Sequence, residues 1–107
     1  MVARNSEALD VFLKVAANSR VSWRAVELAG RGISADAAGV VWMISKGKRS
    51  LSGEELSDLL MKQGDLVDSL SEVWRSFDSG ELSSADFEDQ LEAVVLRLEE
   101  WIQRASR

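Results

Sequence analysis

The sequence predicts an all-α fold of about five helices, with short N-terminal helices packed on a long C-terminal antiparallel helical hairpin. The 107-residue chain contains no proline, which suits long helices because an interior proline would break them. Apolar residues recur at spacings of three and four, a pattern that strands do not produce. With 46% hydrophobic residues, residues 1–107 are long enough to bury a core, and we expect a single helical domain.

The first helix is expected over Ser6–Ala17, with Ser6 as its N-cap, and the polar run Asn18-Ser19-Arg20 would end it. The apolar residues that share one face of this helix are Leu9, Phe12, Leu13 and Ala16.

Two shorter helices are expected next, over Ser22–Ala29 and Ser34–Lys46. Gly30-Arg31-Gly32 would stop the former and Gly47 the latter, because glycine disfavours the helix interior. The segment Gly39–Ile44 is apolar on all sides and rich in β-branched residues, so a buried strand is the alternative there. No second strand is evident elsewhere to pair with it, which favours a helix.

The hairpin is expected to consist of a helix over Ser52–Phe77 and a helix over Ser83–Arg107. Ser52 and Glu55 form a capping-box pattern, and the apolar phase continues across Gly64 without a break. The spacing places both Trp74 and Trp101 in the core. The expected core stripe of the last helix consists of Phe87, Leu91, Val94, Val95, Leu98, Trp101, Ile102 and Ala105.

The residue types exclude much chemistry. There is no histidine, cysteine or tyrosine, so the usual zinc sites, thiol nucleophiles and histidine acid–base catalysis are unavailable. We therefore expect no enzymatic activity, no cofactor and no metal. The N-terminus lacks the apolar core of a signal peptide, and the longest apolar run is far below the roughly 20 residues of a membrane span, so a cytoplasmic protein is expected.

Charge is distributed unevenly along the chain. Residues 1–50 carry eight Lys/Arg and four Asp/Glu, whereas residues 51–107 carry five and fourteen. The C-terminal half therefore has a balance of −9, which disfavours nucleic acid there and would attract a basic partner.

The candidate partner-binding residues are two acidic ridges on the outer faces of the hairpin helices, each with one apolar residue at its centre. This is the composition of an apolar contact surrounded by steering charges, although a solvated helix face with a stray apolar residue is the alternative. The first ridge contains Asp58, Met61, Asp65, Asp68 and Glu72, and the second contains Asp89, Glu92, Leu96, Glu99 and Glu100.

The expected function is that of a small acidic binding protein that occludes or scaffolds a basic partner protein, as immunity proteins, antitoxins and phage inhibitors do. The segment Gly80–Phe87 resembles helix starts in some helical bacterial immunity proteins, but it covers only eight residues and assigns no family. The first alternative is a structural or assembly subunit that forms homo-oligomers. A third is a helix-turn-helix regulator built from Ser22–Ala29 and the following helix, which offers few side chains able to read bases.

Overall fold

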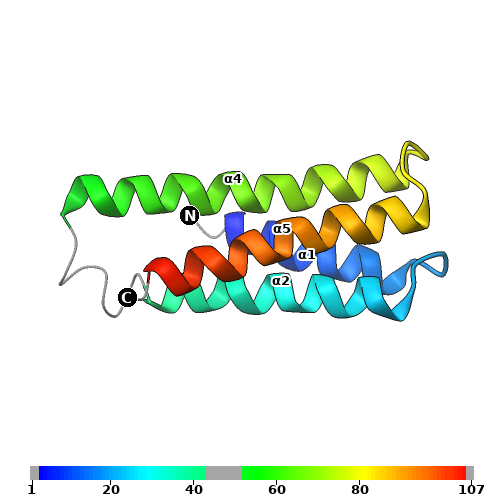
Figure 1. The fold of residues 1–107 in the computed structure, drawn as a ribbon, viewed down its shortest axis with the longest axis horizontal. Helices are drawn as coiled ribbons and strands as arrows, with labels where there is room; N and C mark the ends of the chain where they lie inside the picture. The colour runs from blue at the N-terminus through cyan, green and yellow to red at the C-terminus, as the bar shows by residue number, and fades with distance from the viewer. Residues whose placement is uncertain (1–2, 43–51, 106–107) are drawn as a thin grey trace.

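The computed structural model describes residues 3–42 and 52–105, and the side chains of residues 8–39 and 52–103. These described residues form four helices, α1 (Ala3–Ala17), α2 (Trp23–Trp42), α4 (Gly53–Asp78) and α5 (Ser84–Ala105) (Figure 1). The described ranges contain no strand, which confirms the all-α prediction. The described part of the chain has four helices where about five were predicted, because two of the expected helices, Ser22–Ala29 and Ser34–Lys46, fall in the single helix α2.

Helix α2 runs without interruption through Gly30-Arg31-Gly32, where a turn was expected. Glycine in a helix interior costs roughly 1 kcal/mol relative to alanine, and tertiary packing offsets this. Gly32 is buried, and a Cβ there would lie 3.5 Å from Val95 Cγ2, an ordinary contact distance, so the helix continues here packed against α5. Ser34 therefore lies inside the helix and does not cap it. The helix-turn-helix interpretation requires a turn at Gly30-Arg31-Gly32, and α2 is helical there.

The alternative of a strand at Gly39–Ile44 fails for its first four residues, since Gly39–Trp42 are helical. Met43, Ile44 and the expected helix end at Lys46 and Gly47 lie outside the described residues.

Helix α1 begins at Ala3, so Ser6 is not its N-cap. Its buried stripe also differs from the expected apolar face. Ala8, Val11 and Val15 are buried, whereas Leu9 and Leu13 are 48% and 56% exposed. The helix has apolar residues on two sides, and the stripe with the smaller side chains is the one that packs in the core.

The expected helix starts at Ser22, Ser52 and Ser83 are confirmed by their hydrogen bonds. Ser52 Oγ accepts from the backbone N–H of Glu55 at 3.1 Å, and the Glu55 carboxylate accepts from the backbone N–H of Ser52, which completes the capping box. The hydroxyls of Ser22 and Ser83 each accept from the backbone N–H three residues later. Helix α4 continues through Gly64 as expected, and the turn after it uses the positive φ of Gly80.

The helices form an elongated bundle, 44 Å in its longest dimension. Helices α1 and α4 run in one direction and α2 and α5 in the other (Figure 1). The main contacts among the described helices join α1 to α2, α2 to α5, α5 to α4 and α4 to α1. Helices α2 and α4, consecutive in the described chain, therefore lie diagonally opposite each other.

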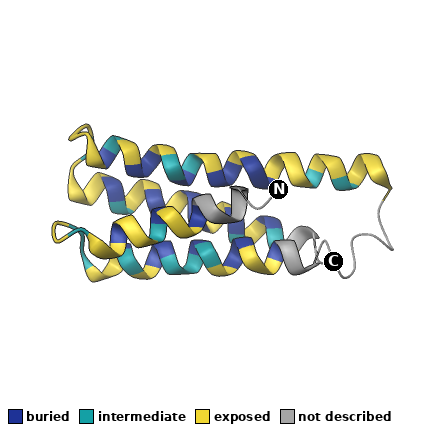
Figure 2. Cartoon of the chain, turned by 180° about the vertical axis from the view of Figure 1, so that it is seen from behind, coloured by how far each residue is buried: buried dark blue, intermediate teal, exposed yellow. Residues whose placement is uncertain are grey.

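Each helix buries one stripe and exposes the rest (Figure 2). Trp74 and Trp101 are buried, as the spacing predicted. Trp74, Phe77 and Phe87 form an aromatic cluster in which the rings of Phe77 and Phe87 stack with centroids 4.4 Å apart. Trp23, at the start of α2, is 88% exposed.

Candidate functional site

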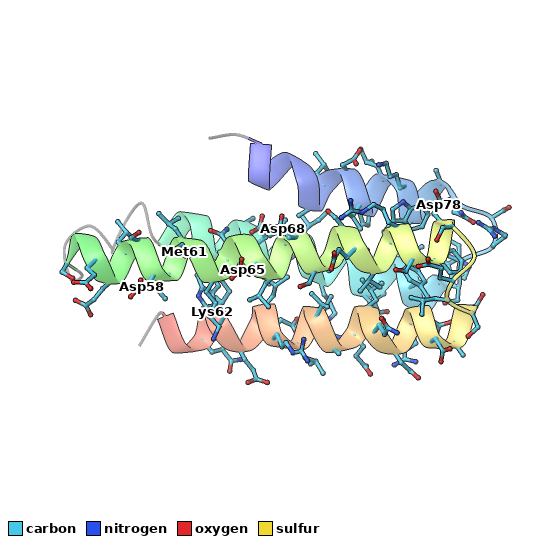
Figure 3. The ribbon with its side chains drawn as sticks, turned by 90° about the horizontal axis from the view of Figure 1, so that it is seen from above. Asp58, Met61, Lys62, Asp65, Asp68 and Asp78 are labelled. Carbon is cyan, nitrogen blue, oxygen red and sulfur yellow. The ribbon has the colours of Figure 1, made fainter. Side chains whose placement is uncertain are left out.

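The first acidic ridge is a continuous exposed arc of α4. The arc, called the α4 ridge below, consists of Asp58, Met61, Asp65, Asp68 and Glu72, all of which are exposed. It lies opposite the stripe that Leu66, Val67, Leu70 and Trp74 bury in the core. Figure 3 shows four of its members along the outer side of α4.

Met61 is the apolar centre of the α4 ridge. Its side chain is 66% exposed, and the adjacent Leu60 is also exposed. Lys62 points instead toward α5 (Figure 3). In Figure 1 the first turns of α4 extend past the N-terminal end of α1, so α1 does not cover this part of the helix.

The second predicted ridge, on α5, is divided by the fold. Glu92 forms an ion pair with Arg24 of α2, with Oε2 of Glu92 2.9 Å from Nη2 of Arg24. Oε1 of Glu88 lies 3.7 Å from Nη1 of the same guanidinium. Arg31 binds Glu99 at two points, Nη2 to Oε1 at 2.6 Å and Nε to Oε2 at 3.1 Å. Glu92 and Glu99 therefore join α5 to α2.

The residues of the second ridge that remain on the outer face of α5 are Asp89, Leu96 and Glu100, all exposed. The fold thus keeps the first predicted ridge together on one arc and separates the second into a structural part and a surface part.

The ion pairs between α2 and α5 were missed by sequence reasoning, although a signal existed. Arg24 and Arg31 are seven residues apart, and so are Glu92 and Glu99. Matched heptad spacing of opposite charges is typical of two helices that lie side by side. The hydrogen bond to Glu92 raises the pKa of Arg24, and that to Glu99 raises the pKa of Arg31, so each carboxylate stabilises the charged guanidinium.

A buried polar contact joins α2 to α4 across the bundle. Gln63 Nε2 donates to Asp36 Oδ1 at 2.7 Å, and both side chains are buried. Burial raises the pKa of Asp36 and the hydrogen bond from Gln63 opposes this. The contact fixes how the two diagonal helices sit relative to each other, and sequence reasoning did not identify it.

The α4 ridge borders a groove of about 570 Å³ between α4 and α5. Polar side chains line much of this groove, among them Ser69, Glu72, Gln90 and Arg97. Among the described residues, no group of three or more carboxylates is placed to hold a metal ion. The groove therefore offers hydrogen-bond donors and acceptors beside the ridge.

No helix among the described residues has both the length and the apolarity needed to cross a membrane. Comparison with protein-family models, with curated proteins and with solved structures gives no match. The surface chemistry of the four helices is therefore the basis for assigning a function.

Proposed function

We propose that this chain is a small helical binding protein whose α4 ridge engages a basic partner protein, which it occludes or scaffolds. The observation that carries the proposal is Met61, 66% exposed at the centre of an arc of exposed carboxylates. Such an arrangement combines an apolar contact with a ring of charges, which is how many protein interfaces are organised.

The two kinds of side chain would act at different stages of binding. Carboxylates attract a cationic partner over about 10 Å at 0.1 M salt and so raise the association rate. Met61 is flexible and polarisable, and its contact forms only after water has been excluded, so it would slow dissociation. The matching partner surface has Lys or Arg side chains around an apolar hollow.

The helix that carries the ridge is held in place before binding. Its first turn is closed by the Ser52–Glu55 capping box, and its inner stripe is packed in the core. A rigid backbone reduces the entropy lost on binding. This preorganisation supports α4 as the recognition element.

The second ridge has a smaller role in this proposal, because Glu92 and Glu99 are bound to Arg24 and Arg31. The proposal retains occlusion in the manner of immunity proteins, antitoxins or phage inhibitors. It also retains a cytoplasmic location and the expected absence of catalysis and of a cofactor.

Affinity capture tests the proposal with three immobilised baits: the native chain, the double variant Asp58→Lys with Asp65→Lys, and the control Asp78→Lys. Asp78 is exposed on the same helix but lies outside the ridge (Figure 3). We expect a basic protein to bind the native chain and the control but not the double variant. Identical capture by all three baits would contradict the proposal.

A further inference from the structure

The indole N–H of Trp101 is a buried hydrogen-bond donor that the bundle does not satisfy. Trp101 is 5% exposed, and no group of the described residues accepts a hydrogen bond from its Nε1. Within the described part of the chain, it is the one fully buried side-chain nitrogen or oxygen in this condition. Such donors are rare in folded proteins, because a buried donor without an acceptor is destabilising. An acceptor supplied from outside the chain would be stabilised at this atom.

The orientation of the Trp101 ring turns this donor away from α2. A Cβ at Gly39 of α2 would collide with Cζ3 of the ring and lie 3.0 Å from Cη2. Nε1 is at the opposite end of the indole from Cζ3, so the N–H faces away from α2. Helix α5 has its main contacts with α2 and α4. The N–H is therefore on the side of α5 that faces α4.

A cavity of about 190 Å³ lies on that side, between α4 and α5. It is lined by Lys62 and Leu66 of α4 and by Arg97, Glu100 and Trp101 of α5. The side chain of Lys62 points toward α5 (Figure 3). Arg97 is four residues before Trp101, so the two side chains share one face of α5. The unsatisfied donor thus belongs to a residue of the cavity wall and has two cations beside it.

The charges around the cavity favour an anion. Lys62 and Arg97 are exposed, and neither forms an ion pair with any described residue. Asp58 and Asp65 are one turn from Lys62 on α4, yet neither pairs with it. Glu100 is the opposing charge and has an interaction of its own. Two cations and one carboxylate leave a balance of +1, which matches a ligand with a single negative charge.

We propose that this cavity binds a small monocarboxylate with an apolar body, and that Trp101 Nε1–H donates a hydrogen bond to the carboxylate. Arg97 can hold a carboxylate through two parallel N–H groups, and Lys62 can add a point charge. Leu66 and the indole ring supply the apolar wall. A cavity of about 150 Å³ is enough for a benzene ring, so about 190 Å³ accommodates such a ring with a carboxylate attached.

Entry of the ligand requires a side chain to move, because Nε1 is covered from solvent. Lys62 and Arg97 are the exposed cations at the cavity, and exposed side chains change rotamer within nanoseconds. The backbones of α4 and α5 can therefore stay in place while the carboxylate enters. This site is on the side of α4 toward α5 and is independent of the α4 ridge and its proposed protein partner.

Nitrogen–proton NMR spectra test the proposal with benzoate as the probe. The four tryptophans give four indole N–H signals, and the signal lost in Trp101→Phe belongs to Trp101. Benzoate should move that signal downfield, because the N–H gains an acceptor, and should leave the signal of the exposed Trp23 in place. Half-saturation is expected on the order of 1 mM for a ligand of this size. A Trp101 signal that stays in place up to tens of millimolar benzoate would overturn the proposal.

Variants of the two cations test the site without disturbing the core, because both side chains are exposed. Lys62→Gln and Arg97→Gln should each weaken benzoate binding by about three- to tenfold and keep the native far-ultraviolet spectrum. The matched control is Arg75→Gln, at an exposed arginine of α4 that does not line this cavity, and it should bind as the native chain does. Equal weakening in all three variants would show a general effect of charge and contradict the site.

Two further probes test the chemical class of the ligand. Benzyl alcohol keeps the ring and lacks the carboxylate, whereas inorganic phosphate keeps negative charge and lacks the ring. Each should move the Trp101 signal only at concentrations at least about tenfold higher than benzoate, because each loses one part of the recognition. A response to phosphate as strong as that to benzoate would refute the apolar part of the proposal, and an equal response to benzyl alcohol would refute the ionic part.

Discussion

Arg31 of α2 binds Glu99 of α5 through two nitrogens, with Nη2 2.6 Å from one carboxylate oxygen and Nε 3.1 Å from the other. Arg24 and Glu92 repeat the pairing seven residues earlier on each helix. Two charged contacts at matching spacing fix the register of α2 against α5. Two of the five residues of the ridge predicted on α5, Glu92 and Glu99, therefore have a structural role.

Replacing Glu99 with Gln should lower the free energy of unfolding by about 0.5–1 kcal/mol, the upper range for a partly exposed ion pair with good geometry. The loss should shrink at high salt, because ions screen the pair. Urea denaturation at low and high salt measures both effects. Asp89→Asn is the matched control on the outer face of α5 and should change stability little; an equal loss in both variants would assign Glu99 to the solvated surface.

Two glycines of α2 should respond to alanine in opposite directions. A Cβ at Gly39 would overlap Trp101 Cζ3 and come within 2.5 Å of Ile102 Cδ1, so Gly39→Ala should destabilise the protein by about 1–3 kcal/mol. At Gly32 the Cβ would meet Leu70 and Val95 at ordinary contact distance, and the better helix propensity of alanine should stabilise by about 0.5–1 kcal/mol. Denaturant unfolding of the two variants checks the signs, and a stabilising Gly39→Ala would show that α2 and α5 are further apart.

Asp36 should make stability depend on pH in the direction opposite to that of a salt-bridged carboxylate. Burial raises its pKa, so between its unfolded and folded pKa values the folded protein binds more protons than the unfolded chain. Its favourable contribution is complete below the unfolded pKa and is lost as pH rises through the folded pKa. Asp36→Asn keeps the oxygen that accepts from Gln63 and removes the charge.

The Asp36→Asn variant should therefore be more stable than the native protein at neutral pH, and the difference should disappear at acid pH below the ordinary carboxyl range. Thermal unfolding from acid to neutral pH measures this difference. A constant difference at all pH values would show that Asp36 titrates normally.

Met61→Ala should speed dissociation of a bound partner while leaving the free energy of unfolding within about 0.5 kcal/mol of the native value, because the side chain contacts solvent. Leu60→Ala is the neighbouring control, since Leu60 is 47% exposed but lies off the ridge. Surface plasmon resonance measures the dissociation rate. A larger increase in the dissociation rate for Leu60→Ala than for Met61→Ala would show that the centre of the binding surface lies outside the α4 ridge.

The sequence was most informative where structure depends on neighbouring residues. The capping box of Ser52 and Glu55 spans three positions, and the buried stripe of α5 repeats every three or four residues, so both could be predicted. The exposed arc around Met61 followed from the same periodicity.

Features that depend on remote contacts could not be predicted locally. Gly30 and Gly32 look like a helix stop until Phe12, Leu70 and Val95 are seen packing beside them. On α1, two apolar stripes compete, and only the other helices determine which of them is buried. The pairing of Glu92 and Glu99 needed α2 to be placed against α5.

The most direct test of the central claim is the salt dependence of the association rate constant between the captured partner and three proteins: the native chain, Asp58→Lys with Asp65→Lys, and Asp78→Lys. Steering by the α4 ridge predicts a steep fall in rate with salt for the native chain and the Asp78 variant. The double variant should associate more slowly and show a flatter dependence. Equal rates and equal salt slopes for all three proteins would contradict the claim that the α4 ridge recognises a basic partner.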